Sequence, residues 1–296
     1  MGFVINNNLA ANNSYRSLNA TQTDLSKSLE KLSTGLRINR AGDDAAGLSI
    51  SEGLKAQVTG SAQAARNAQD GISMIQTAEG GLTEVHSILQ RMRDLAVQGA
   101  NDTNNGDARA AIQKEADSLG EELGRISAST NFNGINLLDG TAGATGDVKI
   151  QVGAGSVAAT DQITVKFSDM TAAYTVGTAG GGVGNLATKT AGTANAGFDV
   201  SDAGKAATTI GNIDQAIKNI SAQRSELGAS QNRLEHTIKS LNVAGENLQA
   251  AQSRIADVDM AQEMVKFTKA NILSQAGTAM LAQANQSSQG VLSLLR

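Results

Sequence analysis

The sequence contains no proline, no cysteine and no tryptophan, and only five phenylalanines and two tyrosines among 296 residues. At the ordinary usage of about 5%, a chain of this length would carry about fifteen prolines. Because proline is the main breaker of long helices, its absence permits uninterrupted helices of many turns. Aromatic side chains supply much of the buried area of globular cores, so their scarcity favours thin helix-on-helix packing of leucine, isoleucine and alanine.

Other absences narrow the possible functions. Without cysteine the chain has no disulfide framework and no thiol nucleophile. The net charge of −4 gives no general attraction to nucleic acid, so we expect no nucleic-acid partner. No apolar run approaches the ~20 residues that span a bilayer, so we expect no membrane insertion. Residues 1–8 lack the basic and apolar regions of a cleaved secretory signal. The sequence therefore predicts a cytoplasmic location, or export by a route that reads no cleaved signal.

The strongest positive signal is a heptad repeat of large aliphatic residues: Ile213, Ile220, Leu227, Leu234, Leu241, Leu248 and Ile255. This spacing is typical of a helix whose apolar seam faces another helix. A helix of about 45 residues is ~68 Å long at a rise of about 1.5 Å per residue, which predicts an elongated antiparallel helical rod or coiled coil. We expect the rod core to contain Ile75, Leu82, Leu89, Ile220, Leu227, Leu234, Leu241 and Leu248.

Both ends of the chain carry further amphipathic patterns. Leucines in residues 1–40 recur at alternating spacings of three and four, and near Ile255 the C-terminal register slips to Val258. We expect the stripe of Leu18, Leu25 and Leu32 and the stripe of Val258, Val265 and Ile272 to bury one another. The residues that we assign to assembly between copies are Leu18, Leu25, Leu29, Leu32, Val258, Val265, Ile272, Leu292 and Leu295.

Our hypothesis is that these terminal helices become ordered when neighbouring copies supply partners, because an isolated helix gains little against its ordering entropy. Contact between two different patches on successive copies builds a helical filament when the rotation does not close. We place the division between packing within one chain and assembly between chains at the slip from Ile255 to Val258.

The middle of the chain combines helices with a small β region. We expect helices over residues 44 to about 98, with a small kink at Gly80-Gly81, and 107 to about 127, paired antiparallel across the turn 99–106. Asp43 or Asp44 is the expected N-cap of the longer helix. Alternating apolar residues then predict a two-stranded hairpin from Val148, Ile150 and Val152 with Ile163, Val165 and Phe167. Residues 170–204 read as low-complexity loop or a loosely packed β region.

No constellation of residues indicates catalysis. Residues 153–158 match the loose dinucleotide pattern G-x-G-x-x-A, but no helix and second parallel strand follow, so a hairpin turn is favoured. His86 and His236 are the only histidines, and neither stands in a metal-ligand spacing. We therefore predict no catalytic residues, no cofactor, no metal site and no enzymatic activity.

Four motifs resemble bacterial flagellin, and they stand in the order that the family has them. They are INNNLAANNSYRSLNATQTDLSKSLEKLSTGLRINRAGDDAAGLSIS at residues 5–51, LQRMRDLAVQ at 89–98, TNFNGINL at 130–137, and SRIADVDMAQEMVKF with NILSQAGTAMLAQANQSSQGVLSLLR in 253–296. The chain is similar to a short member with a reduced variable middle region. The resemblance implies a structural subunit that polymerises into the flagellar filament for motility.

The resemblance also implies a division of the chain. Residues 1–43 and 254–296 would be terminal helices in the inner filament core, 44–140 and 205–253 the helical rod, and 141–204 a variable region that faces outward. The implied partners are further copies of the chain, the flagellar type III export apparatus, an export chaperone, the hook–filament junction protein and the cap protein. The implied location is the extracellular filament. A hook-associated junction protein with similar terminal helices is the alternative, and the rod motifs and VLSLLR favour the filament subunit.

Flagellins of many bacteria are recognised by the vertebrate receptor TLR5. The positions that match are Arg91, Leu95 and Glu115, with Gln90 and Gln98 nearby. Arg91, Leu95 and Gln98 are three or four residues apart and so share one helix face. An arginine beside an aliphatic residue is typical of a binding hot spot. The alternative is that Arg91 is an ordinary assembly or surface charge.

Overall fold

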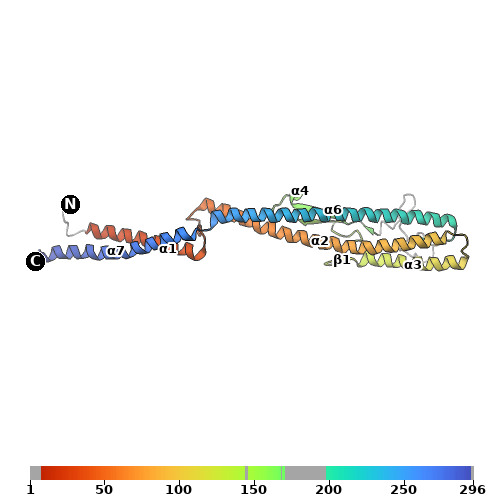
Figure 1. The fold of residues 1–296 in the computed structure, drawn as a ribbon, viewed down its shortest axis with the longest axis horizontal. Helices are drawn as coiled ribbons and strands as arrows, with labels where there is room; N and C mark the ends of the chain where they lie inside the picture. Colours follow the sequence, from red (N-terminus) through yellow and green to blue (C-terminus); the bar gives the residue numbers. More distant parts are fainter. Residues whose placement is uncertain (1–7, 144–145, 168, 171–197, 295–296) are drawn as a thin grey trace. The chain divides into compact units, whose positions relative to one another are not determined.

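The computed structural model describes residues 8–143, 146–167, 169–170 and 198–294. Within them the chain is mainly helical, as predicted, and it carries four short strands (Figure 1). The long helices are α1 (Leu9–Thr34), α2 (Ala45–Gly99), α3 (Gly106–Ser129), α6 (Ala203–Ala256) and α7 (Met260–Leu294). By its contacts the chain divides into two compact units. The terminal unit comprises residues 1–58 and 246–296, and the central unit comprises residues 59–245.

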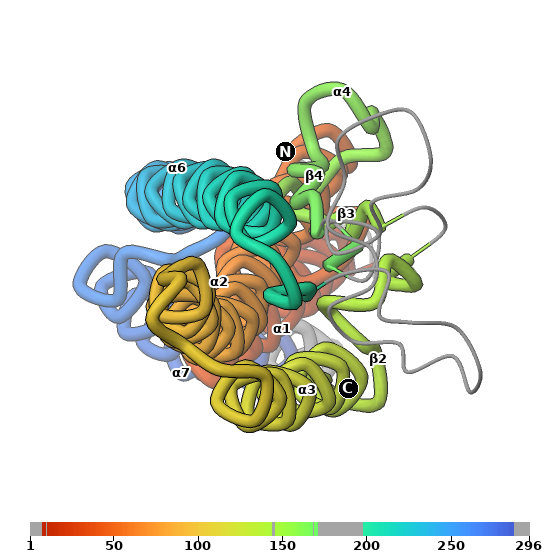
Figure 2. The backbone as a smooth tube through the Cα atoms, turned by 90° about the vertical axis from the view of Figure 1, so that its right-hand side faces the viewer, coloured from red at the N-terminus to blue at the C-terminus, as the bar shows by residue number. Residues whose placement is uncertain are grey.

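In the central unit, α2, α3 and α6 lie side by side with the β region against them (Figure 2). The core between them is almost entirely aliphatic. Its largest fully buried side chains are Ile75, Leu82, Leu89, Met92, Leu95, Leu123, Leu137, Leu138, Met170, Ile213 and Ile220. Leu227 and Leu234 are 1% and 0% exposed, so the heptad seam of α6 is buried from Ile213 to Leu234.

Beyond Leu234 the seam is only half-buried, at Leu241, Leu248 and Ile255. The predicted rod-core residues Leu241 and Leu248 are therefore less deeply buried than Ile220, Leu227 and Leu234. A Cβ atom placed on Gly71 of α2 would lie 2.3 Å from Ile150 Cδ1 and 3.5 Å from Leu234 Cδ1, so Leu234 lies where the β region meets α2. Past this layer the seam has fewer neighbours to cover it.

Gly81 of α2 lies where the segment that follows α3 approaches the helix closely. The helix continues through Gly80 and Gly81, although these residues lower helix propensity. A Cβ atom on Gly81 would lie 2.8 Å from Thr130 Oγ1 and 3.0 Å from Leu138 Cδ1. The missing side chain at Gly81 therefore allows the segment that follows α3 to pack directly on α2.

The β region consists of two separate hairpins. Strands β3 (Asp147–Gln151) and β4 (Gln162–Lys166) pair antiparallel with Ile150 opposite Ile163, which confirms the predicted hairpin. Their connection contains a one-turn helix, α4 (Ala158–Asp161), that the sequence did not predict.

The second hairpin, β1 (Asn131–Phe132) and β2 (Ile135–Asn136), was also not predicted. Its turn is Asn133-Gly134, with φ angles of 52° and 79°. Positive φ angles at two successive residues are typical of a two-residue hairpin turn, in which Asn-Gly is favoured. The Asn-Gly pair in the sequence was therefore a signal for this hairpin. Of the predicted loop 170–204, residues 171–197 lie outside the described residues.

In the terminal unit, α1 and α7 pack against each other, and the adjoining connections are joined through the backbone. Gly35 ends α1 in the left-handed conformation, with a φ of 72°. The Arg37 amide donates to the Ala256 carbonyl at 2.7 Å, and the Val258 amide donates to the Gly35 carbonyl at 3.0 Å. The register slip after Ile255 is thus a break between two helices.

The start of α2 is capped as expected. Asp44 Oδ1 accepts a hydrogen bond from the Gly47 amide at 2.8 Å, so Asp44 is the residue that caps the first turn. Asp43 instead accepts from the backbone amides of Asn39 and Arg40 at 3.2 and 3.1 Å, and it thereby orders the connection from α1.

Replacing Leu234 with alanine should cost about 2–5 kcal/mol of stability, because it removes a fully buried side chain from a packed core. Leu241→Ala is the matched control, since the residue stands one heptad further along the same helix and is already half-exposed. We expect a clearly smaller loss for Leu241→Ala in urea denaturation followed by circular dichroism. Equal losses would contradict the end of the buried seam at Leu234.

Candidate assembly surface

The face of α7 that meets α1 carries few large apolar side chains. Its buried and half-buried residues recur at alternating spacings of four and three: Glu263, Phe267, Ala270, Ser274, Gly277, Leu281 and Ala284. On α1, Leu18, Leu25 and Leu32 are half-buried and belong to the face that meets them. A Cβ atom on Gly277 would lie 3.2 Å from Leu18 Cδ1. Small residues of α7 therefore let α1 approach closely.

The prediction that Val265 and Ile272 pack against the leucines of α1 is wrong. Their side chains are 69% and 61% exposed, and they lie on the side of α7 that α1 does not cover. The seven-residue spacing therefore does indicate an apolar side of α7, but this is the side that α1 leaves uncovered. Val258, the first member of the predicted stripe, is half-buried in the connection before α7.

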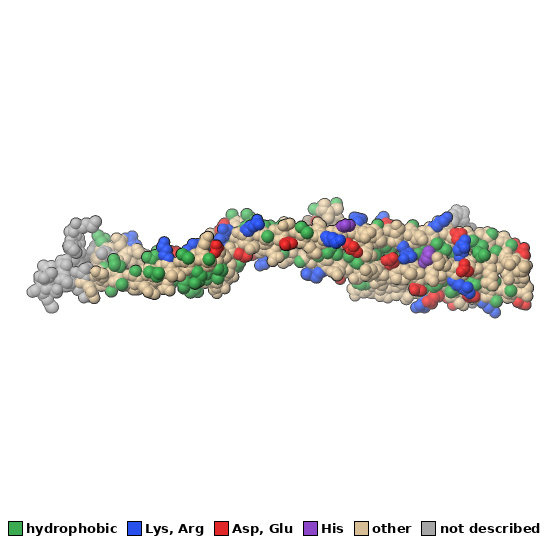
Figure 3. Space-filling model, in the orientation of Figure 1, with side chains coloured by type: hydrophobic (Ala, Val, Ile, Leu, Met, Phe, Trp, Pro, Cys, Tyr) green, Lys and Arg blue, Asp and Glu red, His purple; other side chains and the backbone are tan. Residues whose placement is uncertain are grey.

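Among the described side chains of α7, six large apolar ones are exposed, and one of these, Met260, is the first residue of the helix. We term the other five the open apolar face: Met264, Val265, Ile272, Leu273 and Met280, which are 49–69% exposed. Thr268 and Lys269 line a shallow groove with four of them, with a volume of about 490 Å³. Hydrophobic side chains gather on the surface around this helix in Figure 3. Soluble proteins rarely leave an apolar surface of this kind free of a partner.

The remaining predicted assembly residues lie elsewhere. Leu29 of α1 is 56% exposed and flanks the seam with α7. Leu292 belongs to α7, but its side chain is outside the described part of the chain. Leu295 lies beyond the described residues.

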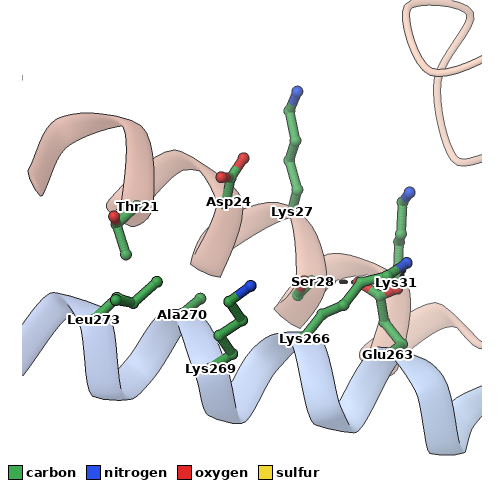
Figure 4. A pocket seen from close by; sticks show the side chains of 10 residues that line it. All are labelled: Thr21, Asp24, Lys27, Ser28, Lys31, Glu263, Lys266, Lys269, Ala270 and Leu273. Carbon is green, nitrogen blue, oxygen red and sulfur yellow. Dashed lines mark hydrogen bonds and ion pairs between the residues drawn. The ribbon is translucent and has the colours of Figure 1, made fainter. Parts of the chain in front are cut away.

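The seam between α1 and α7 contains a buried carboxylate (Figure 4). Glu263 is 4% exposed; its Oε1 atom accepts from Ser28 Oγ at 2.6 Å, and Lys266 Nζ lies 3.1 Å from Oε2. Burial alone raises the pKa of the Glu263 carboxyl. The hydrogen bonds from Ser28 and Lys266, together with the charges of Lys266 and Lys31, outweigh burial, so the pKa lies below its usual value. The carboxylate is thus charged at neutral pH and joins the two helices.

Sequence reasoning missed Glu263. The signal was available as the alternation of four and three through residues 263 to 284, but only Phe267 and Leu281 in that series are large and apolar. A search for aliphatic periodicity therefore selected the stripe on the opposite side of the helix.

The positions carried over for receptor recognition lie in the central unit. Arg91 of α2 donates from Nε and Nη2 to Glu115 Oε1 of α3 at 2.9 and 2.6 Å, and both side chains are about half-exposed. Gln90 and Gln98 are exposed as well. Leu95 is 1% exposed and lies in the core, so it supports this surface from below and is not part of it.

The structure shows no further type of site in its described ranges. No helix there is both long and apolar enough to cross a bilayer. No group of three or more His, Cys, Asp or Glu residues is placed to hold a metal ion in those same ranges. The open apolar face of α7 is the surface described above whose chemistry favours a partner.

The Glu263 carboxylate should make the pairing of α1 and α7 sensitive to acid. Its pKa is depressed in the folded chain, so its contribution is complete above about 4.3, the usual pKa of glutamate, and is lost as the pH falls through the lowered value. We expect Glu263→Gln to be less stable at neutral pH and to lose less helical circular dichroism signal than the parent on acidification. Glu246→Gln, which changes an exposed glutamate of the same unit, is the control. Identical acid profiles for Glu263→Gln and the parent would contradict this role.

Comparison with known proteins agrees with the resemblance in the sequence. The family described as the bacterial flagellin N-terminal helical region matches residues 5–143, and the bacterial flagellin C-terminal helical region matches residues 210–295. A flagellin from Halalkalibacterium halodurans is 52% identical over 99% of this chain and 100% of that protein. The flagellar filament 33 kDa core protein of Treponema phagedenis is 46% identical over 99% of this chain and all of its own length.

A solved structure of a putative flagellar hook-associated protein from Vibrio parahaemolyticus covers 73% of this chain and 100% of its own, with a TM-score of 0.56. Its sequence identity is 15%, so the likeness shows a shared fold alone. The similarity to the whole flagellin of Halalkalibacterium halodurans, in contrast, covers 99% of this chain at 52% identity. The chain belongs to the bacterial flagellin family, whose members are the structural subunits of the flagellar filament.

Proposed function

We propose that this chain polymerises by packing the open apolar face of α7 against a second copy of itself. The observation that carries the proposal is that five large apolar side chains are exposed on one side of α7 while α1 covers the other side. Membership of a family that self-polymerises supports another copy of the chain as the occupant of this face.

The energetics of this face support assembly. Covering the exposed half of each of the five side chains is worth roughly 1 kcal/mol per residue. That total, about 5 kcal/mol, only just exceeds the lower estimates of the cost of immobilising a subunit, ~4 kcal/mol. The face of α7 alone therefore gives a weak contact. A filament in which each subunit contacts several neighbours turns weak contacts into a stable polymer.

The proposal assigns roles to the whole chain. Residues 1–43 and 254–296 form the inner filament core, residues 44–140 and 205–253 form the surrounding rod, and residues 141–204 face outward. The chain leaves the cell through the flagellar type III export apparatus with a chaperone, and it meets the junction and cap proteins at the two ends of the filament. Its role is structural and not enzymatic.

Ile272→Lys should abolish growth of filaments on sheared filament seeds, because it places a charge at the centre of the open apolar face. Asn271→Lys adds the same charge at the neighbouring exposed position of α7, beside this face, and should polymerise more nearly like the parent. Negative-stain microscopy of seeded samples measures the filament length. Long filaments from Ile272→Lys would overturn the proposed contact.

The same seeding assay separates the filament subunit from a hook-associated junction protein. A filament subunit extends the seeds into long tubes, whereas a junction protein adds a limited number of copies and stops. We expect the parent chain to extend them, since its rod and terminal sequences match whole flagellins end to end.

We also propose that the surface around Arg91 is recognised by TLR5. The guanidinium of Arg91 is held by two hydrogen bonds to Glu115, so it is presented in one orientation between two exposed glutamines. A fixed arginine that loses little entropy on binding is typical of a hot spot. Leu95 contributes by packing beneath this part of α2.

Arg91→Ala should reduce activation of a TLR5 reporter by at least about tenfold, the size of effect that a hot-spot arginine produces. Arg125→Ala is the matched control, because Arg125 makes a comparable exposed ion pair with Glu122 on α3. Both proteins must show the circular dichroism spectrum of the parent. Full reporter activity of Arg91→Ala would exclude the hot-spot role.

A further inference from the structure

Six of the seven methionines lie in the described part of the chain, and these six divide into two environments; Met1 lies outside the described residues. Met74, Met92 and Met170 are 4%, 0% and 1% exposed in the core of the central unit. Met260, Met264 and Met280 are 49%, 49% and 59% exposed, and all three belong to α7. Two of them, Met264 and Met280, are members of the open apolar face. The exposed thioethers are therefore concentrated on the helix to which we assign assembly.

We propose that Met260, Met264 and Met280 form an oxidation site, at which peroxide converts the unassembled subunit into a form that does not polymerise until it is reduced. This inference rests on the proposed packing of α7 against a second copy. It adds a covalent modification, its position and its consequence for assembly.

The reaction needs only a peroxide and the thioether. A sulfur lone pair attacks one oxygen of hydrogen peroxide, the oxygen–oxygen bond breaks, and the departing hydroxide takes the remaining proton to form water. Each sulfur is oxidised to the sulfoxide, and each peroxide is reduced. A dithiol reductase reverses the change, releases water and forms its own disulfide.

Exposure makes this reaction selective within the chain. The sulfur atoms of Met74, Met92 and Met170 lie in a packed core that the oxidant does not enter without unfolding. Met260, Met264 and Met280 are all about half-exposed to solvent, and Met264 and Met280 lie on the side of α7 that α1 leaves uncovered. Oxidation therefore modifies the terminal unit while the core of the central unit keeps its packing.

The surroundings of Met264 explain why the sulfoxide opposes assembly. Its groove is lined by Val265, Ile272 and Leu273, which cannot donate a hydrogen bond to a sulfoxide oxygen. The hydroxyl of Thr268 already donates to the Met264 carbonyl at 2.8 Å, which leaves Lys269 as the charged donor of the groove. A second copy that covers this face would have to bury a strongly polar oxygen among aliphatic side chains.

The test treats the purified, unassembled full-length chain with hydrogen peroxide, maps sulfoxides by peptide mass spectrometry and measures growth on filament seeds. We expect Met260, Met264 and Met280 to oxidise at least about tenfold faster than the three core methionines, as their exposure requires. The critical concentration for growth should rise at least about tenfold, which corresponds to ~1.4 kcal/mol, and treatment with methionine sulfoxide reductases should restore it.

A variant in which Met260, Met264 and Met280 are all replaced by leucine keeps the volume and apolar character of the face. Before treatment it should grow like the parent, and after treatment it should keep growing. Met92→Leu is the control, because it removes a buried thioether, and it should remain as sensitive as the parent. The single variant Met264→Leu should lose less growth after peroxide treatment than the parent does. It replaces the triple variant in this test if the triple variant does not fold.

Two outcomes would overturn the inference. One is loss of growth after peroxide in the leucine variant to the same extent as in the parent. The other is unchanged growth of parent chains that carry all three sulfoxides. Preformed filaments should oxidise at these positions at least about tenfold more slowly than free subunits, since assembly covers them. Failure of the proposed assembly would be seen separately, as untreated parent chains that do not extend seeds.

Discussion

The close packing of α1 on one side of α7 determines which surfaces of the terminal unit stay free. Ala270 and Gly277 let the backbones of the two helices approach, and Ser28 holds the carboxylate of Glu263 between them. With that side of α7 occupied, the larger aliphatic and thioether side chains can only face outward. The interaction within one chain thus brings mainly small and polar residues of α7 against the leucines of α1 and leaves the open apolar face uncovered.

This division explains where sequence reasoning succeeded and where it did not. Long helices, the β3–β4 hairpin and the break near Ile255 all followed from periodicity, because each depends on local spacing. The partner of the Val265 and Ile272 stripe did not follow, because periodicity shows that a helix has an apolar side but not which helix covers it. The seven-residue spacing pointed to α1, whereas close approach through alanine and glycine decided the actual pairing.

The same distinction holds in the central unit. Burial of Ile213 to Leu234 could be predicted from the heptad, but the lower burial of Leu241 and Leu248 in the same seam depends on tertiary packing, which the spacing does not show. The exposed pair of Arg91 and Glu115 could be located only from the family resemblance, since the two residues are 24 positions apart on different helices. The burial of Leu95 beneath them is a consequence of three-helix packing, which no single helix pattern contains.

The backbone bonds between residues 35–37 and 256–258 also have a mechanical meaning. They join the connection that follows α1 to the connection that precedes α7, in an antiparallel arrangement at Leu36 and Asp257. Both connections lack a long side-chain seam of their own, so without these bonds each would swivel separately. With them, a pull or twist applied to either terminal helix loads both connections at once. A load on either terminal helix is therefore shared by two connections that are held together through their backbone.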